Sequence, residues 1–189
     1  MATDVADAPV VPRPRRAGVP YRVAIVCLGN ICRSPMADVV LTGKLVDAGL
    51  DRDVDVVSAG TGGWHVGDPM DRRAAALLTA HGYDASAHRV RQFERDWYDE
   101  CDLVLAMDGD NLTDLTALGP HVEPGRLLMF RDFDPRSSGE HDRDVPDPFY
   151  GGDEGFATVL AMVERTCAAL VEALARTLDP DRDAQRAGG

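Results

Sequence analysis

The segment between residues 23 and 35 constrains the fold more than any other part of this chain. Val23–Val26 is a short, mostly β-branched apolar run, which predicts a buried strand. Ser34 followed by Pro35 predicts a helix start, with Ser34 as the N-cap and Pro35 at the first helical position. A short, glycine-containing loop joins the two. Such a loop turns backbone N–H groups towards a common centre near the positive end of the helix dipole, which favours an anion.

The residues at the two ends of this loop suggest what the anion would be. The loop opens with Cys27 and closes with Arg33, and it lacks the Gly-Lys-Ser/Thr ending of a nucleotide-binding loop. Amide dipoles and a guanidinium stabilise a thiolate, and an arginine fork binds two oxygens of a phosphoryl group. The pair predicts thiolate attack on phosphorus to give a phosphocysteine. The alternative is a buried cysteine and a surface arginine at an ordinary strand–helix turn.

Composition limits the class of protein and its partners. The chain has 189 residues, of which 44% are hydrophobic and 28% charged, which is typical of one globular domain. Its net charge of −12 argues against non-specific nucleic-acid binding and against anionic membrane surfaces. A phosphate site in such a chain must therefore depend on local charges.

The cysteines and the apolar segments predict a cytoplasmic protein that needs no metal or other cofactor. The four cysteines match neither a zinc pattern nor a Cys-x-x-Cys redox motif. Residues 1–19 contain no apolar core of the kind found in signal peptides, and no apolar run approaches the length that spans a bilayer. We therefore expect a reduced protein in the cytoplasm.

Strand and helix patterns alternate along the chain. We expect strands at 23–26, 54–58, 102–107 and 126–130, and helices at 35–48, 69–81, 108–118 and 153–178. The second helix is placed by Asp68 as N-cap and Pro69 after it. This alternation predicts a single α/β domain over residues 20–178, with a four-stranded parallel sheet, helices on both faces and the phosphate-binding loop after the first strand. Residues 1–19 and 179–189 are predicted to be flexible tails.

Phosphate-ester cleavage also needs an acid for the leaving group, and position singles out one of the 32 acidic residues. Asp147 lies between Pro146 and Pro148, and the aromatic residues Phe149 and Tyr150 follow. Two prolines restrict the backbone and so aim the carboxyl group. A placed general acid contributes roughly 10²–10⁴-fold to the rate. Alone, the same pattern would describe an ordinary turn.

Two motifs together resemble a known family. The run Cys27-Leu-Gly-Asn-Ile-Cys-Arg-Ser-Pro-Met-Ala37 and the run Asp147-Pro-Phe-Tyr-Gly151 are similar to the signatures of low-molecular-weight protein tyrosine phosphatases, and the resemblance covers Tyr21 to Leu178. It implies hydrolysis of phosphotyrosine through a phosphocysteine. By this resemblance Cys27 is the nucleophile, Arg33 binds the phosphoryl group, and Ser34 donates a hydrogen bond to the sulfur. Asp147 acts first as general acid and then as general base.

The resemblance also implies roles for the surrounding residues. The phosphate would be bound by the loop residues Leu28, Gly29, Asn30, Ile31 and Cys32. The walls of the site would be Trp64, Phe149 and Tyr150, although a lone tryptophan is more often found in a core. Hydrogen bonds among Asn30, Ser58 and His88 would hold the loop in left-handed backbone conformations. Cys32 would form a reversible disulfide with Cys27, or would simply fill space in the loop.

The expected partners are a phosphotyrosine-containing protein as substrate and inorganic phosphate as product inhibitor, with no nucleic acid and no membrane. The chain is expected to be a monomer or a weak dimer. Other functions remain open: an arsenate reductase, a protein-arginine phosphatase or a non-catalytic phosphate-binding module. The segment 82–97 contains none of the extra cysteines that a reductase needs. Relatives that act on phosphoarginine tend to carry a smaller, polar residue in place of Ile31, which favours phosphotyrosine.

Overall fold

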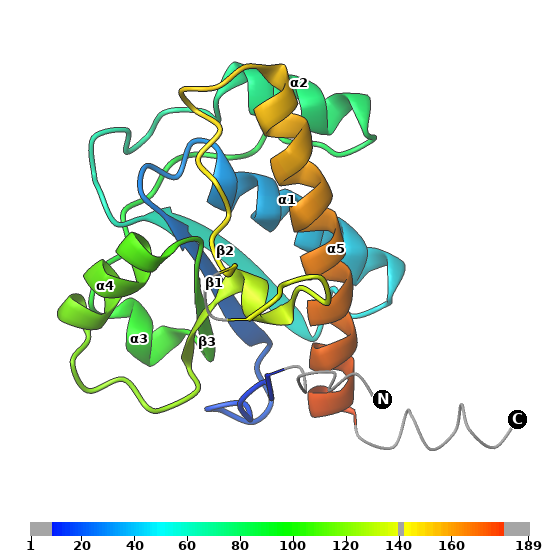
Figure 1. Cartoon of the computed structure of the whole chain (residues 1–189). Helices are drawn as coiled ribbons and strands as arrows, with labels where there is room; N and C mark the ends of the chain where they lie inside the picture. The colour runs from blue at the N-terminus through cyan, green and yellow to red at the C-terminus, as the bar shows by residue number, and fades with distance from the viewer. Residues whose placement is uncertain (1–8, 140–141, 180–189) are drawn as a thin grey trace, which may run out of the picture.

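The structure, a computed structural model, describes residues 9–139 and 142–179 and forms the predicted α/β sheet (Figure 1). Four parallel strands lie in the order β2-β1-β3-β4. Their bounds are Tyr21–Cys27 for β1, Val54–Gly60 for β2, Leu103–Ala106 for β3 and Leu127–Met129 for β4. The first strand is therefore central, and the loop that follows it opens at the carboxyl edge of the sheet, where ligands of such sheets bind.

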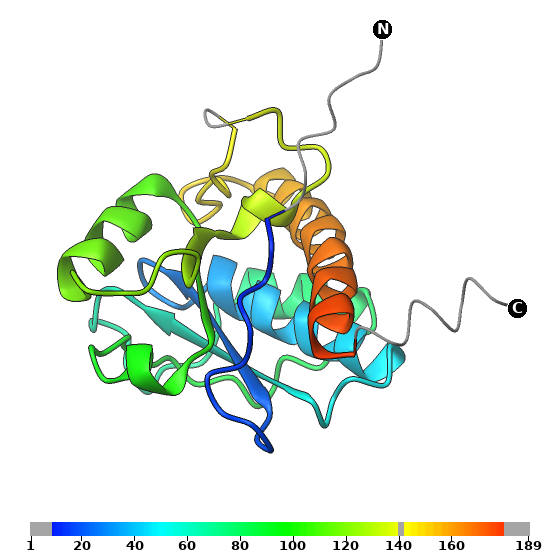
Figure 2. The same ribbon diagram turned by 90° about the horizontal axis from the view of Figure 1, so that it is seen from below.

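Helices cover both faces of the sheet, as predicted. The helices α1 (Arg33–Asp47), α2 (Arg72–Ala80) and α5 (Asp153–Leu178) lie on one side, and α3 (Trp97–Glu100) and α4 (Gly109–Leu118) on the other (Figures 1 and 2). A 3-10 turn, η1 (Phe130–Phe133), follows β4.

Alternate side chains of the central strand enter two different cores. Val23 and Ile25 of β1 pack with α1 and α5, whereas Ala24 and Val26 pack with α3 and α4. This alternation is the two-residue period of a strand with both faces buried. Both cores thus hold β1 in place and fix the position of Cys27 at its end.

Two predicted helix starts are wrong by a few residues. The first helix begins at Arg33 with Cys32 as N-cap, so the Ser34 hydroxyl lies inside the helix and makes no capping bond. The second begins at Arg72, and its N-cap is Asp71, whose carboxylate accepts the Arg73 N–H at 2.8 Å. Asp68 and Pro69 lie before it, in a segment without regular secondary structure. The N–H of Asp71 is held by the Ile31 carbonyl at 2.8 Å, so a tertiary contact sets where the second helix starts.

The N-terminal segment is more ordered than expected. Residues 9–19 pack against the domain: Val11 is buried, and the Tyr21 hydroxyl donates to the Pro12 carbonyl at 3.0 Å. The backbone N–H of Arg15 donates to Asp102 at 2.6 Å. The domain therefore includes this segment. Residues 1–8 of the expected first tail and 180–189 of the second lie outside the described residues.

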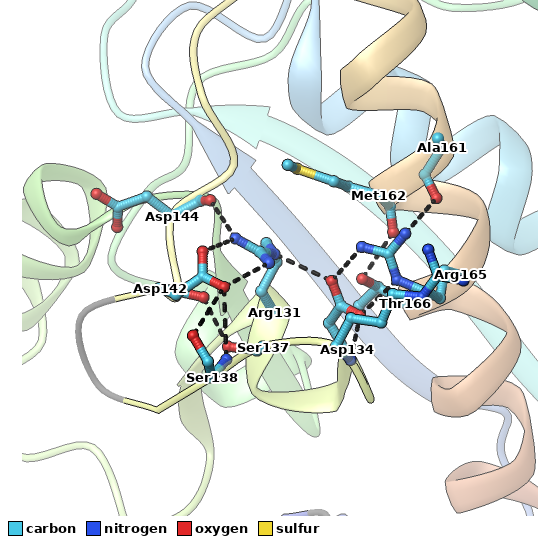
Figure 3. A network of polar contacts seen from close by, with 11 residues as sticks. Arg131, Asp134, Ser137, Ser138, Asp142, Asp144, Ala161, Met162, Arg165 and Thr166 are labelled. Atoms are coloured by element: carbon cyan, nitrogen blue, oxygen red, sulfur yellow. Dashed lines mark hydrogen bonds and ion pairs between the residues drawn. The ribbon is translucent and has the colours of Figure 1, made fainter.

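The long stretch between η1 and α5 is anchored by an ionic network around the buried Asp134 (Figure 3). The Asp134 side chain is fully buried and accepts hydrogen bonds from Arg165 of α5 at 2.7 Å and from Arg131 at 3.1 Å. Arg131 also donates to Asp142 and to the Asp144 carbonyl. This network joins the segment that precedes Asp147 to α5.

Within residues 9–139 and 142–179, none of the helices combines the length and the apolar character that a membrane span requires.

Candidate active site

The loop after β1 places the Cys27 sulfur among hydrogen-bond donors. The Sγ atom lies 3.0 Å from the Ser34 hydroxyl and accepts the Asn30 N–H at 3.2 Å. The neighbouring strand approaches closely, since Cys27 pairs with Gly60. A Cβ on Gly60 would lie 2.7 Å from the Leu28 carbonyl oxygen, so glycine is required there.

Asn30 organises the loop through both its backbone and its side chain. It is the one non-glycine residue with a positive φ, 54°, in the described part of the chain. Its Nδ2 donates to the Ser34 hydroxyl at 2.9 Å, and its Oδ1 accepts the Arg91 N–H at 3.0 Å. Asparagine tolerates left-handed backbone better than most residues. The side chain thereby fixes the hydroxyl that faces the sulfur.

His88 supports the loop from behind, and Ser58 does not. The His88 Nε2 lies 3.0 Å from the Asn30 carbonyl oxygen. Burial lowers the pKa of His88, so the ring is neutral at pH 7 and Nε2 carries the proton that it donates. Ser58 instead donates to Asp38 of α1 at 2.8 Å. The expected hydrogen-bonding trio of Asn30, Ser58 and His88 is therefore only a pair.

Arg33 is buried beneath the mouth of the site and contacts two carboxylates. Its guanidinium donates to Asp108, to Asp147 Oδ2 at 3.3 Å and to the Val145 carbonyl at 3.3 Å. The sequence predicted a helix that begins at Asp108 but gave it no place in the site. Its Oδ1 does cap α4, accepting the Asn111 N–H, while Oδ2 pairs with Arg33. Its position two residues after the end of β3, at the same sheet edge as Cys27, is the signal that could have located it.

Asp147 and three aromatic rings surround the opening above Cys27. Asp147 Oδ1 accepts the Phe149 N–H at 3.0 Å, which aims the carboxylate together with Arg33. Trp64 and Tyr150 are largely exposed, and the rings of Phe149 and Tyr150 meet edge to face with centroids 5.0 Å apart. These residues line a cavity of about 300 Å³ with Cys27, Leu28, Gly29, Ile31, Cys32, Arg33 and His65.

Known proteins share this arrangement of sequence and fold. The family profile described as low molecular weight phosphotyrosine protein phosphatase matches residues 22–179. The chain belongs to this family. A low molecular weight protein-tyrosine-phosphatase of Streptomyces coelicolor is 46% identical over 155 residues, which are 82% of this chain and 93% of the relative. Phosphatase A of Mycobacterium tuberculosis is 47% identical over 145 residues, which are 77% and 86% of the two chains.

Solved structures of this phosphatase family agree with the fold. The crystal structure of a protein tyrosine phosphatase from Entamoeba histolytica superimposes with a TM-score of 0.75 at 31% identity, covering 82% of this chain and 96% of the other. The predicted family, fold and enzyme class are confirmed. This family member is a protein-tyrosine phosphatase, a phosphoric monoester hydrolase, and phosphotyrosine compounds are its substrate class.

The second cysteine of the phosphatase loop lies in the same cavity as the first. Cys32 is almost fully buried. Burial, reinforced by the Asp71 carboxylate, raises the pKa of Cys32 to about 12. Its sulfur is therefore a protonated thiol at neutral pH. Cys27 and Cys32 thus lie in different settings, one among hydrogen-bond donors and one against apolar packing and a negative charge.

Proposed function

We propose that this phosphatase cleaves phosphotyrosine by attack of the Cys27 sulfur on phosphorus. A sulfur–phosphorus bond forms while the bond from phosphorus to the tyrosine oxygen breaks. The observation that carries the proposal is the Cys27 sulfur at the floor of the cavity, 3.0 Å from the Ser34 hydroxyl and 3.2 Å from the Asn30 amide. Both donors stabilise the thiolate before attack and when it leaves.

Binding of the phosphoryl group is assigned to the loop and to Arg33. We assign the phosphoryl oxygens to the backbone amides of the loop residues between Cys27 and α1, which are Leu28, Gly29, Asn30, Ile31 and Cys32. Arg33 supplies the one permanent positive charge among the described residues that line the cavity. Inorganic phosphate, the product, fits the same nest and acts as an inhibitor.

Asp147 transfers the protons in this mechanism. As the ester bond breaks, the Asp147 carboxyl gives its proton to the tyrosine oxygen. The resulting carboxylate then takes a proton from a water molecule, whose oxygen attacks phosphorus and releases Cys27 as a thiolate. Side chains and water balance both steps, so the proposal includes no metal or other cofactor. Support comes from the bonds that aim Asp147, to Arg33 and to the Phe149 N–H.

Selectivity for phosphotyrosine is assigned to the depth and walls of the cavity. Trp64, Phe149 and Tyr150 line the cavity that Cys27 also lines, and such aromatic walls suit the flat ring of a phenyl phosphate. Phosphoarginine is the second candidate, because the crystal structure titled Drosophila arginine phosphatase superimposes with a TM-score of 0.72 at 28% identity. Ile31, an aliphatic residue lining the cavity, favours the aromatic substrate.

The test combines variants and substrates. We expect Cys27→Ser to abolish p-nitrophenyl phosphate turnover but to keep phosphate binding, and Asp147→Asn to lower kcat about 10²-fold or more. Cys101→Ala, at a buried cysteine outside the site, is the matched control and should turn over normally. Normal rates for Cys27→Ser would refute the mechanism. Faster hydrolysis of a phosphoarginine or phosphoserine peptide than of the phosphotyrosine peptide would refute the selectivity.

The setting of the enzyme is also part of the proposal. We infer a cytoplasmic monomer or weak dimer, since the four cysteines, all within the described residues, are free thiols. Cell fractionation tests the location. Sedimentation at several concentrations tests the oligomeric state.

A further inference from the structure

Arg73, which the sequence did not single out, lies between the phosphate loop and the loop that carries Asp147. On one side its guanidinium binds the carboxylate of Asp71, with Nε 3.2 Å from Oδ1 and NH2 3.0 Å from Oδ2. Asp71 in turn donates its backbone N–H to the carbonyl oxygen of Ile31 at 2.8 Å. Asp71 therefore links Arg73 to the backbone of the phosphate loop.

On the other side Arg73 binds the backbone that follows Asp147. Its NH2 donates to the Phe149 carbonyl at 3.1 Å and its NH1 to the Gly151 carbonyl at 3.4 Å. The guanidinium carbon also lies 4.7 Å from the centre of the Phe156 ring and 5.6 Å from that of Phe149. The Arg73 guanidinium therefore contacts Phe156 of α5, the N-cap of α2 and the loop after Asp147 at the same time.

Phe149 links this contact to the proton donor. Its carbonyl oxygen accepts from Arg73, while its N–H donates to Asp147 Oδ1 at 3.0 Å. A continuous chain of hydrogen bonds therefore runs from the Ile31 carbonyl through Asp71, Arg73 and Phe149 to the carboxylate of Asp147. The same arginine packs on the Phe149 ring, which is one wall of the cavity.

Exposure indicates that this chain matters for geometry more than for stability. The Arg73 side chain is 39% exposed, and ion pairs in contact with water contribute little to the free energy of unfolding. A planar guanidinium can bind a carboxylate, donate to two carbonyls and stack on a ring simultaneously, which a lysine ammonium cannot. Small displacements of a catalytic group have large effects on rate.

We propose that Arg73 is a positioning residue that joins Asp71 to the Phe149 carbonyl and so holds Asp147 at its working distance from the phosphate loop. The inference rests on the proposed function, in which Asp147 protonates the leaving oxygen. It assigns Arg73 no contact with the substrate. Arg73 instead affects the rate at which Asp147 transfers its proton to the leaving oxygen.

The test is the dependence of kcat/KM on the leaving group, since a misplaced acid matters most when the departing oxygen is strongly basic. We expect Arg73→Ala to lower kcat/KM about 10- to 100-fold for phenyl phosphate, a part of what a placed acid supplies. For p-nitrophenyl phosphate, whose leaving group is far more acidic, the loss should be about threefold or less. Arg73→Lys, which keeps the charge but loses the fork, should behave like Arg73→Ala.

Matched controls separate positioning from loss of charge or of folding. Arg72→Ala removes the same charge from the adjacent, exposed position of α2 and should follow the wild type. Urea unfolding should show similar midpoints for all three variants. An equal loss for both substrates, or wild-type behaviour of Arg73→Lys, would overturn the inference while leaving the proposed function intact. If Asp147→Asn itself showed no steeper dependence on the leaving group, the acid assignment and the inference would both fall.

Discussion

The buried carboxylate of Asp134 offers the sharpest test of how the loop before Asp147 is anchored. Asp134→Asn keeps the size of the side chain and removes its charge. Burial alone would raise the pKa of Asp134, but hydrogen bonds from Arg165, the Arg136 N–H and Arg131 outweigh burial and lower it to about 2. The charge removed is therefore one that the folded protein stabilises strongly.

The expected cost follows from this pKa. A carboxyl group that titrates at 3.8 in the unfolded chain and at about 2 in the folded one contributes about 2 kcal/mol to the free energy of unfolding. The substitution also leaves the buried Arg131 without one of its partners, and breaking a buried pair costs about 3–5 kcal/mol. We therefore expect Asp134→Asn to lose about 2–4 kcal/mol at pH 7.

The pH dependence supplies the second half of the test. Because the folded pKa lies below the unfolded value, the stabilisation is complete above pH 4–5 and is lost as the pH falls towards 2. Urea unfolding of wild type and variant at pH 7, 5 and 3.5 should show a difference that narrows only at the lowest pH. A difference that stays constant at all three values would refute the role given to charge.

A control lies in the same network. Asp142 also pairs with Arg131, but 46% of its side chain is exposed. Water screens such a pair, so Asp142→Asn should cost clearly less than Asp134→Asn. Equal losses for the two variants would refute the reasoning from burial.

Three further predictions concern the loop and its surroundings. Burial raises the pKa of Asp38 to about 6, so the folded protein loses stability as pH rises from about 4 to 6. In urea unfolding, Asp38→Asn should therefore be more stable than wild type at pH 7.5, by at most about 3 kcal/mol, and as stable as wild type near pH 4. Asn30→Ala loses two buried side-chain hydrogen bonds and strains a left-handed backbone, so it should lower the free energy of unfolding by about 2–4 kcal/mol. Asn30→Gly avoids the strain and should lower it by about 1 kcal/mol less. The reverse order of stability in thermal unfolding would contradict this. Peroxide should oxidise Cys27 to a sulfenic acid that the Cys32 thiol converts to a disulfide with release of water, so activity should return with dithiothreitol in wild type. In Cys32→Ser a second equivalent of peroxide should oxidise the sulfenic acid to a sulfinic acid, which dithiothreitol does not reduce, so activity should not return. Mass spectrometry without a Cys27–Cys32 link would remove the idea.

The sequence was sufficient for the sheet and for the family signatures that lie beside its carboxyl edge. Val23–Val26 is a mostly β-branched apolar run, and Val54–Ser58 contains three valines and is followed by a glycine-rich turn; such local signals indicate strands. The signature around Cys27 and the Pro-Asp-Pro turn at Asp147 were each visible within a dozen residues. These features depend on near neighbours in the chain, and sequence patterns report near neighbours.

Most of the errors involve partners that are distant in sequence. Ser58 donates to Asp38, 20 positions away, and Asp108 pairs with Arg33 across 75 positions. The α2 helix starts at Arg72 because the Asp71 amide is taken up by the phosphate loop, although Asp68-Pro69 is an equally good local start signal. Val11 is buried although the composition around it is that of a tail. No local pattern records these contacts.

The two carboxylates on Arg33 have different tasks in the proposed mechanism, and their burial indicates which is which. With a net charge of −12 the chain does not attract a phosphate from a distance, so binding depends on the loop amides and on Arg33. The Asp108 side chain is 20% exposed and caps a helix, so it holds the guanidinium in place. Asp147 is 40% exposed, and its contact with Arg33 is longer, at 3.3 Å. An arriving phosphate dianion competes with Asp147 for Arg33, because both are anions that bind the same guanidinium. In the proposed mechanism substrate binding thus releases Asp147 from the guanidinium, while Asp108 keeps the arginine aligned.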